Sequence, residues 1–356
     1  MREKITGVAE TARHQEHGQI SSVADFAKYL GLSAWTVSRA INGHPEVSEK
    51  TRYRVRQAMD EIGFHPNPMA RGMRGRDTGL IGVSVGGSAS PILSTKIYHL
   101  QESLRAQHRR SLLEFSVRDP QNEIRVIEDF LRLRVDGIVL IYSALEAREA
   151  QRMLKGMACV QVDPHYPQTL PTVAVDRHRA MQLLLEHLLS LGHKRFALLG
   201  FNEEDPWRWP ALVEYAEKRN LSPKRTFFPL GSAPPAEKAL EAGRAMAIQA
   251  QQLASKPTAF IAMDDRIAIG AIQALKEAGV DVPGEISVTG FDNLDLARNL
   301  RPTLTTIEQN PIALMEQAAQ LLFRQMAQPS RQGGKIELTV EPQLVIGEST
   351  GPVSRH

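Results

Sequence analysis

The residues with the clearest chemistry lie in the segment VADFAKYLGLSAWTVSRAIN, residues 23–42. Its apolar residues recur at helical spacing before and after Gly31, where a turn between two helices usually needs a glycine-like backbone. Val37 and Ile41 point inward from the second helix. The outward face can contact base edges or phosphates through Ser33, Ala34, Trp35, Thr36, Ser38, Arg39 and Asn42. The segment therefore predicts a helix-turn-helix that contacts DNA.

Catalytic chemistry has no comparable signal. The sequence contains no P-loop, no GxSxG, no HExxH and no dinucleotide fingerprint. Asp264 and Asp265 are neighbours at the start of a predicted helix, where adjacent carboxylates rarely share a metal ion, and we expect Asp265 to cap that helix. Cys159 is the only cysteine and lies in an apolar strand, so we expect an inert core residue. We therefore expect no enzyme, no cofactor and no metal site.

The sequence shows two different apolar patterns, and the elements that they predict must position these residues. From Ser22 to Phe64, three short amphipathic helices are predicted over residues 23–30, 33–42 and 48–62, capped by serines and stopped by glycines. Their core is expected to contain Val23, Phe26, Ala27, Val37, Ile41, Val55 and Met59. After Arg76, short apolar runs without polar alternation alternate with helical patterns. This favours the α/β class, with two doubly wound parallel-sheet lobes whose ligands lie beyond the carboxyl ends of the strands.

Composition is typical of a globular protein. The chain has 356 residues, 42% hydrophobic and 23% charged, which suggests two or three domains. The net charge is +3, but residues 20–76 carry nine Lys/Arg against five Asp/Glu, so the basic head is expected to meet a polyanion. No apolar run is long enough to span a membrane, and residues 1–20 lack the apolar region of a secretory signal. We expect a cytoplasmic protein with a disordered N-terminal tail.

The segment 32–75, LSAWTVSRAINGHPEVSEKTRYRVRQAMDEIGFHPNPMARGMRG, resembles the DNA-binding head and hinge of the LacI/GalR family. TVSRAIN, VSEKTR and HPNPMAR occur in order at that family's spacing. The resemblance continues through DGIVLI, EHLLSLGHKRFALLG, DDRIAIGAIQALKEAG, ISVTGFDN and LTTIEQN, from Ser22 to about Thr350. It implies a transcriptional regulator, commonly a repressor, that binds a pseudo-palindromic operator in double-stranded DNA as a homodimer. It also implies a periplasmic-binding-protein-like core, crossed by three chain segments, that binds a small-molecule effector such as a sugar or sugar derivative.

Within the head, Arg39 and Trp35 are the candidates for base recognition. Arg39 suits a bidentate contact with guanine O6 and N7, worth roughly 1–3 kcal/mol of discrimination, or it clamps a phosphate. Trp35 either contacts thymine methyl groups or folds back against the head and reads nothing. We expect Thr51, Arg52, Asn42 and the serine hydroxyls to contact phosphates, which sets the register without specifying a sequence.

Residues 67–73 resemble the hinge helix of the family, which packs against its dimer mate in the minor groove. Asn67 would cap it and Pro68 would take the first helical position. Met73 stands where the family usually inserts a leucine between base pairs. The remaining predicted contacts are Ala70 and Arg71. Because so short a helix is marginal in water, we expect it to fold only on the operator.

By the same resemblance, three residues face the effector: Arg208, Asp264 and Asp292. The facing lobe is expected to contribute Ser90, Ile92, Tyr142, Asp163 and Asp176. An arginine opposite carboxylates suits a polyol, because each hydroxyl both donates and accepts; the alternative for Asp292 is a strand-end turn. The loop FNEEDPWRWP departs from the family, Ala211 replaces a family glycine, and PLGSAPPAEKA lacks an aromatic. Trp207 or Trp209 either supplies a stacking surface instead or packs structurally.

The predicted organisation is a tail, a DNA-binding domain, a hinge, a core and a short tail: 1–20, 21–64, 65–78, 79–350 and 351–356. The N-lobe is assigned residues 79–174 and 306–330, and the C-lobe 175–305 and 335–349. No leucine heptads follow, so a dimer is expected rather than a tetramer. A secreted sugar-binding protein is disfavoured by the DNA-binding head. A regulator with a degenerate pocket that answers to a protein co-regulator stays open because of the 201–210 loop.

Overall fold

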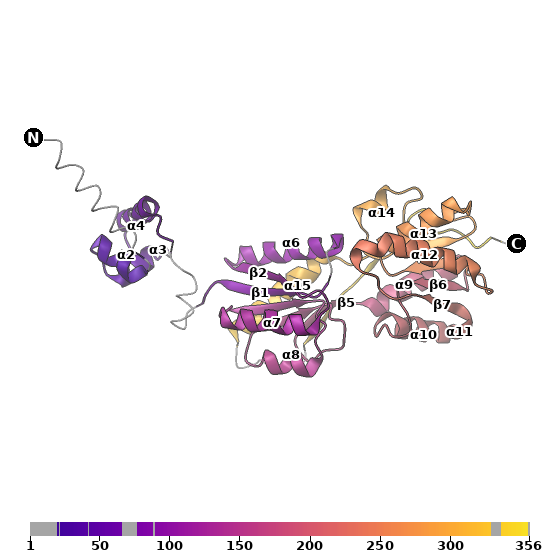
Figure 1. The fold of residues 1–356 in the computed structure, drawn as a ribbon, viewed down its shortest axis with the longest axis horizontal. Helices are drawn as coiled ribbons and strands as arrows, with labels where there is room; N and C mark the ends of the chain where they lie inside the picture. The colour runs from indigo at the N-terminus through magenta and orange to yellow at the C-terminus, as the bar shows by residue number, and fades with distance from the viewer. Residues whose placement is uncertain are drawn as a thin grey trace, which may run out of the picture. The chain divides into compact units, whose positions relative to one another are not determined.

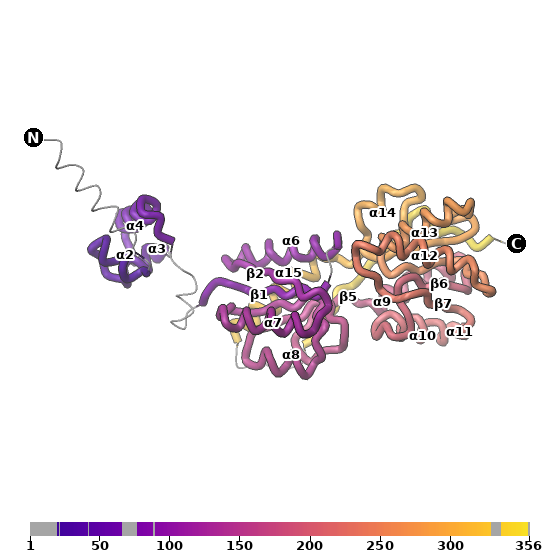
Figure 2. The backbone as a smooth tube through the Cα atoms, viewed as in Figure 1, coloured from indigo at the N-terminus to yellow at the C-terminus, as the bar shows by residue number. Residues whose placement is uncertain are grey.

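The computed structural model of the chain describes residues 20, 22–41, 43–65, 77–87, 90–328 and 336–354. The chain divides into two compact units, residues 1–78 and 79–356 (Figures 1 and 2). The N-terminal tail up to residue 19 and the hinge helix 67–73 lie outside the described residues. So do the predicted DNA contacts Asn42, Asn67, Ala70, Arg71 and Met73.

The first unit contains three helices among its described residues: α2 (Val23–Leu30), α3 (Ala34–Ile41) and α4 (Glu49–Ile62). Ser22 caps α2 by accepting a hydrogen bond from the Asp25 N–H, and Gly31 ends the helix at a φ of 63°. Ser48 and Gly63 bound α4 in the same way. The buried core contains Phe26, Ala27, Val37 and Val55 as predicted, whereas Val23, Ile41 and Met59 are only partly buried against it.

The N-lobe of the second unit is built on a six-stranded, all-parallel sheet in the order β11-β5-β4-β3-β1-β2. The strands are β1 (Leu80–Val85), β2 (Arg110–Phe115), β3 (Gly137–Ile141), β4 (Cys159–Val162), β5 (Thr172–Val175) and β11 (Glu337–Val340). The helices are α6 (Pro91–Ala106), α7 (Pro120–Arg132), α8 (Ala147–Met153) and α15 (Pro311–Ala327). Every residue of β3 is buried, as expected for an apolar run covered on both faces.

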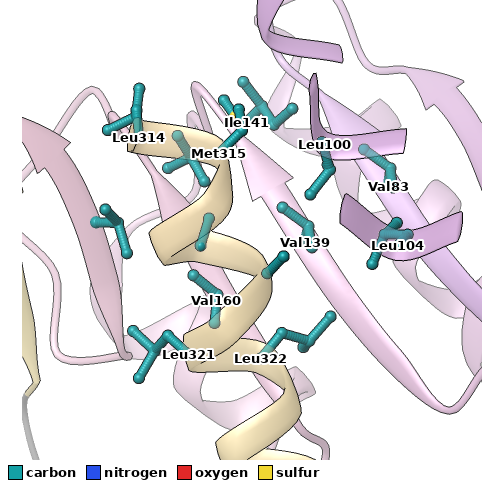
Figure 3. Packing of buried hydrophobic residues seen from close by; sticks show 14 of the residues in the cluster. Val83, Leu100, Leu104, Val139, Ile141, Val160, Leu314, Met315, Leu321 and Leu322 are labelled. Atoms are coloured by element: carbon teal, nitrogen blue, oxygen red, sulfur yellow. The ribbon is translucent and has the colours of Figure 1, made fainter. Parts of the chain in front are cut away.

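Alternate residues of each strand enter different cores. Val139 and Ile141 face α6 and α15, whose Leu104 and Leu322 belong to the same buried cluster (Figure 3). The intervening residues Ile138 and Leu140 pack instead with Phe130 of α7. This period of two gives a three-layered lobe, with helices on both faces of the sheet.

The C-lobe repeats the design with a parallel sheet in the order β7-β6-β8-β9. Its strands are β6 (Phe196–Leu199), β7 (Phe227–Leu230), β8 (Ala259–Ala262) and β9 (Ser287–Thr289). One face packs against α12 (Ala239–Gln252) and α13 (Asp265–Glu277), the other against α9 (Arg177–Ser190) and α10 (Arg208–Lys218). The short helices are α11 (Pro223–Thr226), η2 (Ala236–Lys238) and α14 (Asp295–Asn299).

Three segments cross between the lobes: after β5, after β10 (Thr306–Glu308), and between β11 and β12 (Gln343–Val345). The predicted lobe boundaries need a correction at two of them. Residues 306–308 pair with β12 and pack on the C-lobe core, and residues 337–340 extend the N-lobe sheet beside β5. The sequence does not reveal this because so short a strand is placed by whichever sheet edge it meets in the fold.

A close crossing of α12 and α13 fixes the position of α13, which begins at Asp265. A Cβ at Gly270 would overlap the Leu240 carbonyl, and one at Gly243 would overlap that of Ile267. We predict that Gly270→Ala lowers the free energy of unfolding by about 1–3 kcal/mol through overpacking. In an exposed helix the same change would raise it by about 1 kcal/mol. Urea unfolding beside the exposed control Gln273→Ala checks this; a more stable Gly270→Ala would contradict the close crossing.

Candidate functional site

The outward face of α3 begins with a capped turn. The Ser33 hydroxyl accepts a hydrogen bond from the Thr36 N–H at 3.0 Å and lies 2.8 Å from the Thr36 hydroxyl. Both hydroxyls therefore already serve the helix start. Ala34 is exposed and Ser38 half-buried on the same helix. In α4, the hydroxyl of Thr51 pairs with that of Ser48 at 2.8 Å.

Trp35 and Arg39 form one unit on this face. The Trp35 side chain is 58% exposed, so it does not enter the core of the head. The Arg39 guanidinium lies over its ring, 4.2 Å from the centroid, and also pairs with Glu46. Such a stacked cation is worth about 0.5–1 kcal/mol at an exposed site. The unit holds the arginine at the surface of the helix, while its role in reading bases stays a prediction.

A cavity of about 170 Å³ lies between the two lobes of the second unit. Seven of the eight predicted ligand residues line it: Ser90, Ile92, Tyr142, Asp163, Arg208, Asp264 and Asp292. The exception is Asp176, which follows β5 and accepts a hydrogen bond from the Arg179 N–H at 2.8 Å. It caps α9 and lines a neighbouring cavity rather than this one, so the structure does not group it with the other seven.

The ends of the parallel strands supply much of this lining. Tyr142, Asp163 and Asp292 follow β3, β4 and β9, and their φ angles are 55°, 48° and 114°. Residues other than glycine seldom adopt such angles, and held backbone strain tends to gather at functional sites. Carboxyl ends of neighbouring parallel strands meet at one edge, which is why these side chains converge.

Lys96 on α6 is the centre of a buried polar network behind the cavity wall. Its side chain is fully buried, and its Nζ donates to Asp163 at 2.7 Å, Gln309 at 2.7 Å and Tyr142 at 2.9 Å. Burial opposes the charged amine, but Asp163 and Tyr142 outweigh it and raise the pKa of Lys96. Burial likewise opposes the Asp163 carboxylate, but Lys96 and Arg177 lower its pKa to about 2. Asp163 is therefore an ionised partner of two cations.

The C-lobe wall contains two arginine–aspartate pairs. Arg208 Nη1 lies 3.1 Å from Asp205, and Arg266 Nη2 lies 3.1 Å from Asp264. Asp264 also accepts a hydrogen bond from the Ile267 N–H at 2.8 Å, so Asp264 rather than Asp265 is the N-cap of α13. The predicted capping role of Asp265 is wrong by one residue.

Asp265 and Asp292 are buried carboxyl groups, and their hydrogen bonds only partly offset the cost of burying a charged carboxylate. Asp265 accepts hydrogen bonds from Thr306 at 2.5 Å and from the Leu294 N–H at 2.7 Å, yet burial raises its pKa to about 7. Burial, together with Asp265 and Asp264, raises the pKa of Asp292 well above its ordinary value. Gln309 donates to Asp292 and so links this carboxyl group to Lys96.

The two tryptophans of the unusual loop have different surroundings. Trp207 lines the cavity, and its indole N–H donates to the His165 carbonyl at 3.2 Å. Trp209 instead packs edge-on against Phe227, with ring centroids 6.0 Å apart, at the margin of the C-lobe core. Only Trp207 is therefore in a position to meet a ligand in this cavity.

Five residues that complete the site are not among those predicted from the sequence. Lys96, Arg118, His165, Arg177 and Gln309 either line the cavity or bind its lining residues. One signal was available: Lys96 falls on the buried face of α6 with Ile92, Leu93 and Leu100, where a lysine needs a partner. Cys159 is buried, and burial raises its pKa to about 12, consistent with an inert thiol.

Neither a metal site nor a membrane span is evident in the part of the chain that the structure describes. No group of three metal-ligating side chains occurs among those residues. None of the described helices is both long and apolar enough to cross a bilayer.

Comparison with known proteins gives consistent relatives for both units. Residues 22–67 match the model of bacterial regulatory proteins of the lacI family, and residues 185–350 match a periplasmic binding protein-like domain. The chain is 30% identical to the transcriptional repressor CytR of Escherichia coli, covering 93% of this chain and 96% of CytR. It is 28% identical to the repressor PurR of Mannheimia succiniciproducens, covering 94% and 100%.

Among solved structures, the Lac repressor dimer bound to operator and an anti-inducer matches with a TM-score of 0.79. The match covers 93% of this chain and 99% of that chain at 23% identity, so it supports the fold. The curated relatives named above are transcriptional repressors and not enzymes.

His165 provides a test of the cavity environment. Burial, and then Arg118, Arg177 and Arg208, lower its pKa to about 4. Because the unfolded histidine titrates near 6.5, the unfolded chain binds more protons between about pH 4 and 6.5, and stability from this group rises with pH. We predict that the stability of wild type relative to His165→Asn increases by about 2 kcal/mol from pH 5 to pH 7.

Urea unfolding of both proteins at the two pH values measures this change. Taking the difference between them removes the contributions of other groups, including Asp265, whose raised pKa acts in the opposite direction over the same range. A difference that does not change with pH would contradict a buried, neutral His165.

Proposed function

Because the chain belongs to the lacI family of bacterial regulatory proteins, we propose that it is a DNA-binding transcriptional repressor controlled by a small molecule. The observation that carries the proposal is the cavity between the lobes, lined by seven predicted ligand residues on a chain that also carries an exposed helix-turn-helix face. The effector is proposed to be a sugar or sugar derivative, and its binding sets the affinity for operator DNA.

In this proposal α3 lies in the major groove with Ala34, Trp35 and Arg39 at base edges. Ser33, Thr36, Ser38, Asn42 and Thr51 contact the backbone and fix the register. Two chains bind a pseudo-palindrome as a homodimer, because two-fold symmetry of the protein matches two-fold symmetry of the site. The hinge, residues 65–78, supplies Asn67, Ala70, Arg71 and Met73 to the minor groove and folds there.

The cleft acts by binding the effector across both lobes. Tyr142 and Asp163 come from the N-lobe, Arg208 and Asp264 from the C-lobe, so a bridging ligand favours one closure state over the other. Hydroxyl groups suit this mixture of donors and acceptors. Trp207 offers the aromatic surface that PLGSAPPAEKA lacks. The closure state determines the geometry of the dimer and thereby whether the hinge helices can form.

Base recognition by Arg39 can be separated from phosphate binding. The preferred operator is first selected from random duplexes with the full chain. We predict that Arg39→Met loses roughly 1–3 kcal/mol of discrimination at one base pair of each half-site. The matched variant Arg52→Met should weaken binding to all sequences alike, as loss of a phosphate contact does. Unchanged preferences of Arg39→Met across single-base operator variants, measured by fluorescence anisotropy, would contradict base readout by Arg39.

The effector is tested by thermal unfolding against sugars, sugar acids, phosphosugars and nucleobases. A specific ligand at about 100 times its Kd adds roughly 2.7 kcal/mol and raises Tm by some degrees. Arg208→Gln should abolish the shift. Arg219→Gln, at the other end of α10 and outside the cavity, should keep it. A shift that survives Arg208→Gln would place the ligand elsewhere, and silence across the panel would favour a protein co-regulator.

A further inference from the structure

We propose that the effector of this cleft is an anion, a small molecule whose carboxylate or phosphate group lies between Arg118, Arg177 and Arg208. The inference rests on the proposed function and narrows its ligand class. Its basis is an imbalance of charge around the cavity, an arginine held there by a strained turn, and buried nitrogen atoms of cavity-lining residues that have no hydrogen-bond partner among the described residues.

The charge imbalance follows from the ion pairs. Four arginines line the cavity: Arg118, Arg177, Arg208 and Arg266. Lys96 lies directly behind the cavity wall. Against them stand three carboxylates that are engaged as ions: Asp163, Asp205 and Asp264. Asp292 is the fourth lining carboxyl group, and burial raises its pKa well above its ordinary value, so it holds a proton more readily than an exposed aspartate does. Four arginines therefore stand against three ion-paired carboxylates in the lining, and a closed cleft focuses such a potential on its ligand.

The shortage of negative charge is greatest on the side of the cavity where Asp163 lies. One carboxylate serves both Lys96, at 2.7 Å, and Arg177, at 3.2 Å. A neutral ligand would leave this arrangement electropositive, whereas an oxyanion beside Arg177 would complete it. Arg–carboxylate and Arg–phosphate contacts are charge-assisted and frequently bidentate, so they favour planar or tetrahedral oxyanions.

Arg118 reaches the cavity from a turn that is costly to form. Val117 and Arg118 have φ angles of 50° and 57°, and a β-branched valine is a rare occupant of that region. The turn is fixed at both ends: the Ser116 N–H donates to the Val85 carbonyl at 2.9 Å, and Asp119 caps α7. Arg118 makes no hydrogen bond or ion pair with the residues that the structure describes. Strain of about 1–3 kcal/mol per residue is expected where it serves a function.

Buried nitrogen atoms without partners occur on three residues that line the same cavity. Arg208 Nε, Arg266 Nε and one ring nitrogen of His165, Nε2, are buried and have no hydrogen-bond partner among the described residues. The Arg208 side chain is 10% exposed, and a buried polar atom in a native structure usually has a hydrogen-bond partner. Burial, and then Arg118, Arg177 and Arg208, lower the pKa of His165, so the three arginines lie near one part of the cavity lining.

The test compares glucose with two of its anionic derivatives, glucuronate and glucose 6-phosphate, by calorimetric titration of the full chain. We expect at least one anion to bind about tenfold or more tightly than glucose, and Arg118→Gln to remove about tenfold of that affinity. The control Arg125→Gln removes an exposed charge from α7 in the same lobe and should change neither. The two anions distinguish a carboxylate from a phosphate as the recognised group.

A second measurement does not depend on the sugar skeleton. Quenching of Trp207 fluorescence by iodide, taken as the difference between wild type and Trp207→Phe, reports the local anion concentration. We expect Arg118→Gln to lower the iodide quenching constant about twofold, while quenching by neutral acrylamide stays unchanged. Arg125→Gln should alter neither constant.

The outcomes separate this inference from the proposed function. If glucose binds and both anions do not, the anion inference is overturned but the effector-controlled repressor stands. If no probe binds and iodide quenching ignores Arg118→Gln, the anion inference is overturned as well. If no probe binds but iodide quenching depends on Arg118, the anion class is supported with a different carbon skeleton.

Discussion

The ammonium group of Lys96 is buried completely, and three side chains around the cleft are arranged to satisfy it. An uncompensated buried charge costs about 3–5 kcal/mol when its partner is lost. Three acceptors meet it at 2.7–2.9 Å, from the end of β3, the end of β4 and the crossing after β10. Gln309 also donates a hydrogen bond to Asp292 in the C-lobe, which extends the network to that lobe. One charge therefore ties together α6, two strand ends, a crossing segment and the opposite lobe.

Such a network is better suited to specifying geometry than to adding stability. Buried ion pairs are often replaced by apolar groups without loss of stability, so their value lies in the arrangement that they enforce. Here the arrangement extends across the lobes through Gln309, so a change in lobe closure must alter its hydrogen bonds. A ligand that bridges Tyr142 and Asp292 would act on the same groups. This gives the cleft a physical route to two discrete states, which allosteric control requires.

Local signals made much of the fold predictable. The ends of the head helices follow from Ser22, Ser48, Gly31 and Gly63, because caps and stops act within one turn. The apolar runs of β1 and β3 likewise predict strands buried on both faces. The position of β11 was not predictable, since four residues pair with whichever sheet edge lies nearby. The resemblance to a family located Arg208, Asp264 and Asp292 around the cavity, but their roles in binding stay predictions.

The remaining errors come from contacts between distant residues. In the sequence Lys96 resembles an ordinary helix residue, because its three partners lie 46, 67 and 213 positions away and contact it only in the folded chain. The strained turn at Val117 and Arg118 has no sequence signature. Asp176 also follows a strand that ends at the cleft, yet it caps α9.

The most direct test of control through the cleft is the operator affinity of the full chain with and without a saturating cleft ligand. We predict a change of about 5–150-fold that Arg208→Gln abolishes; equal affinities would contradict control through the cleft.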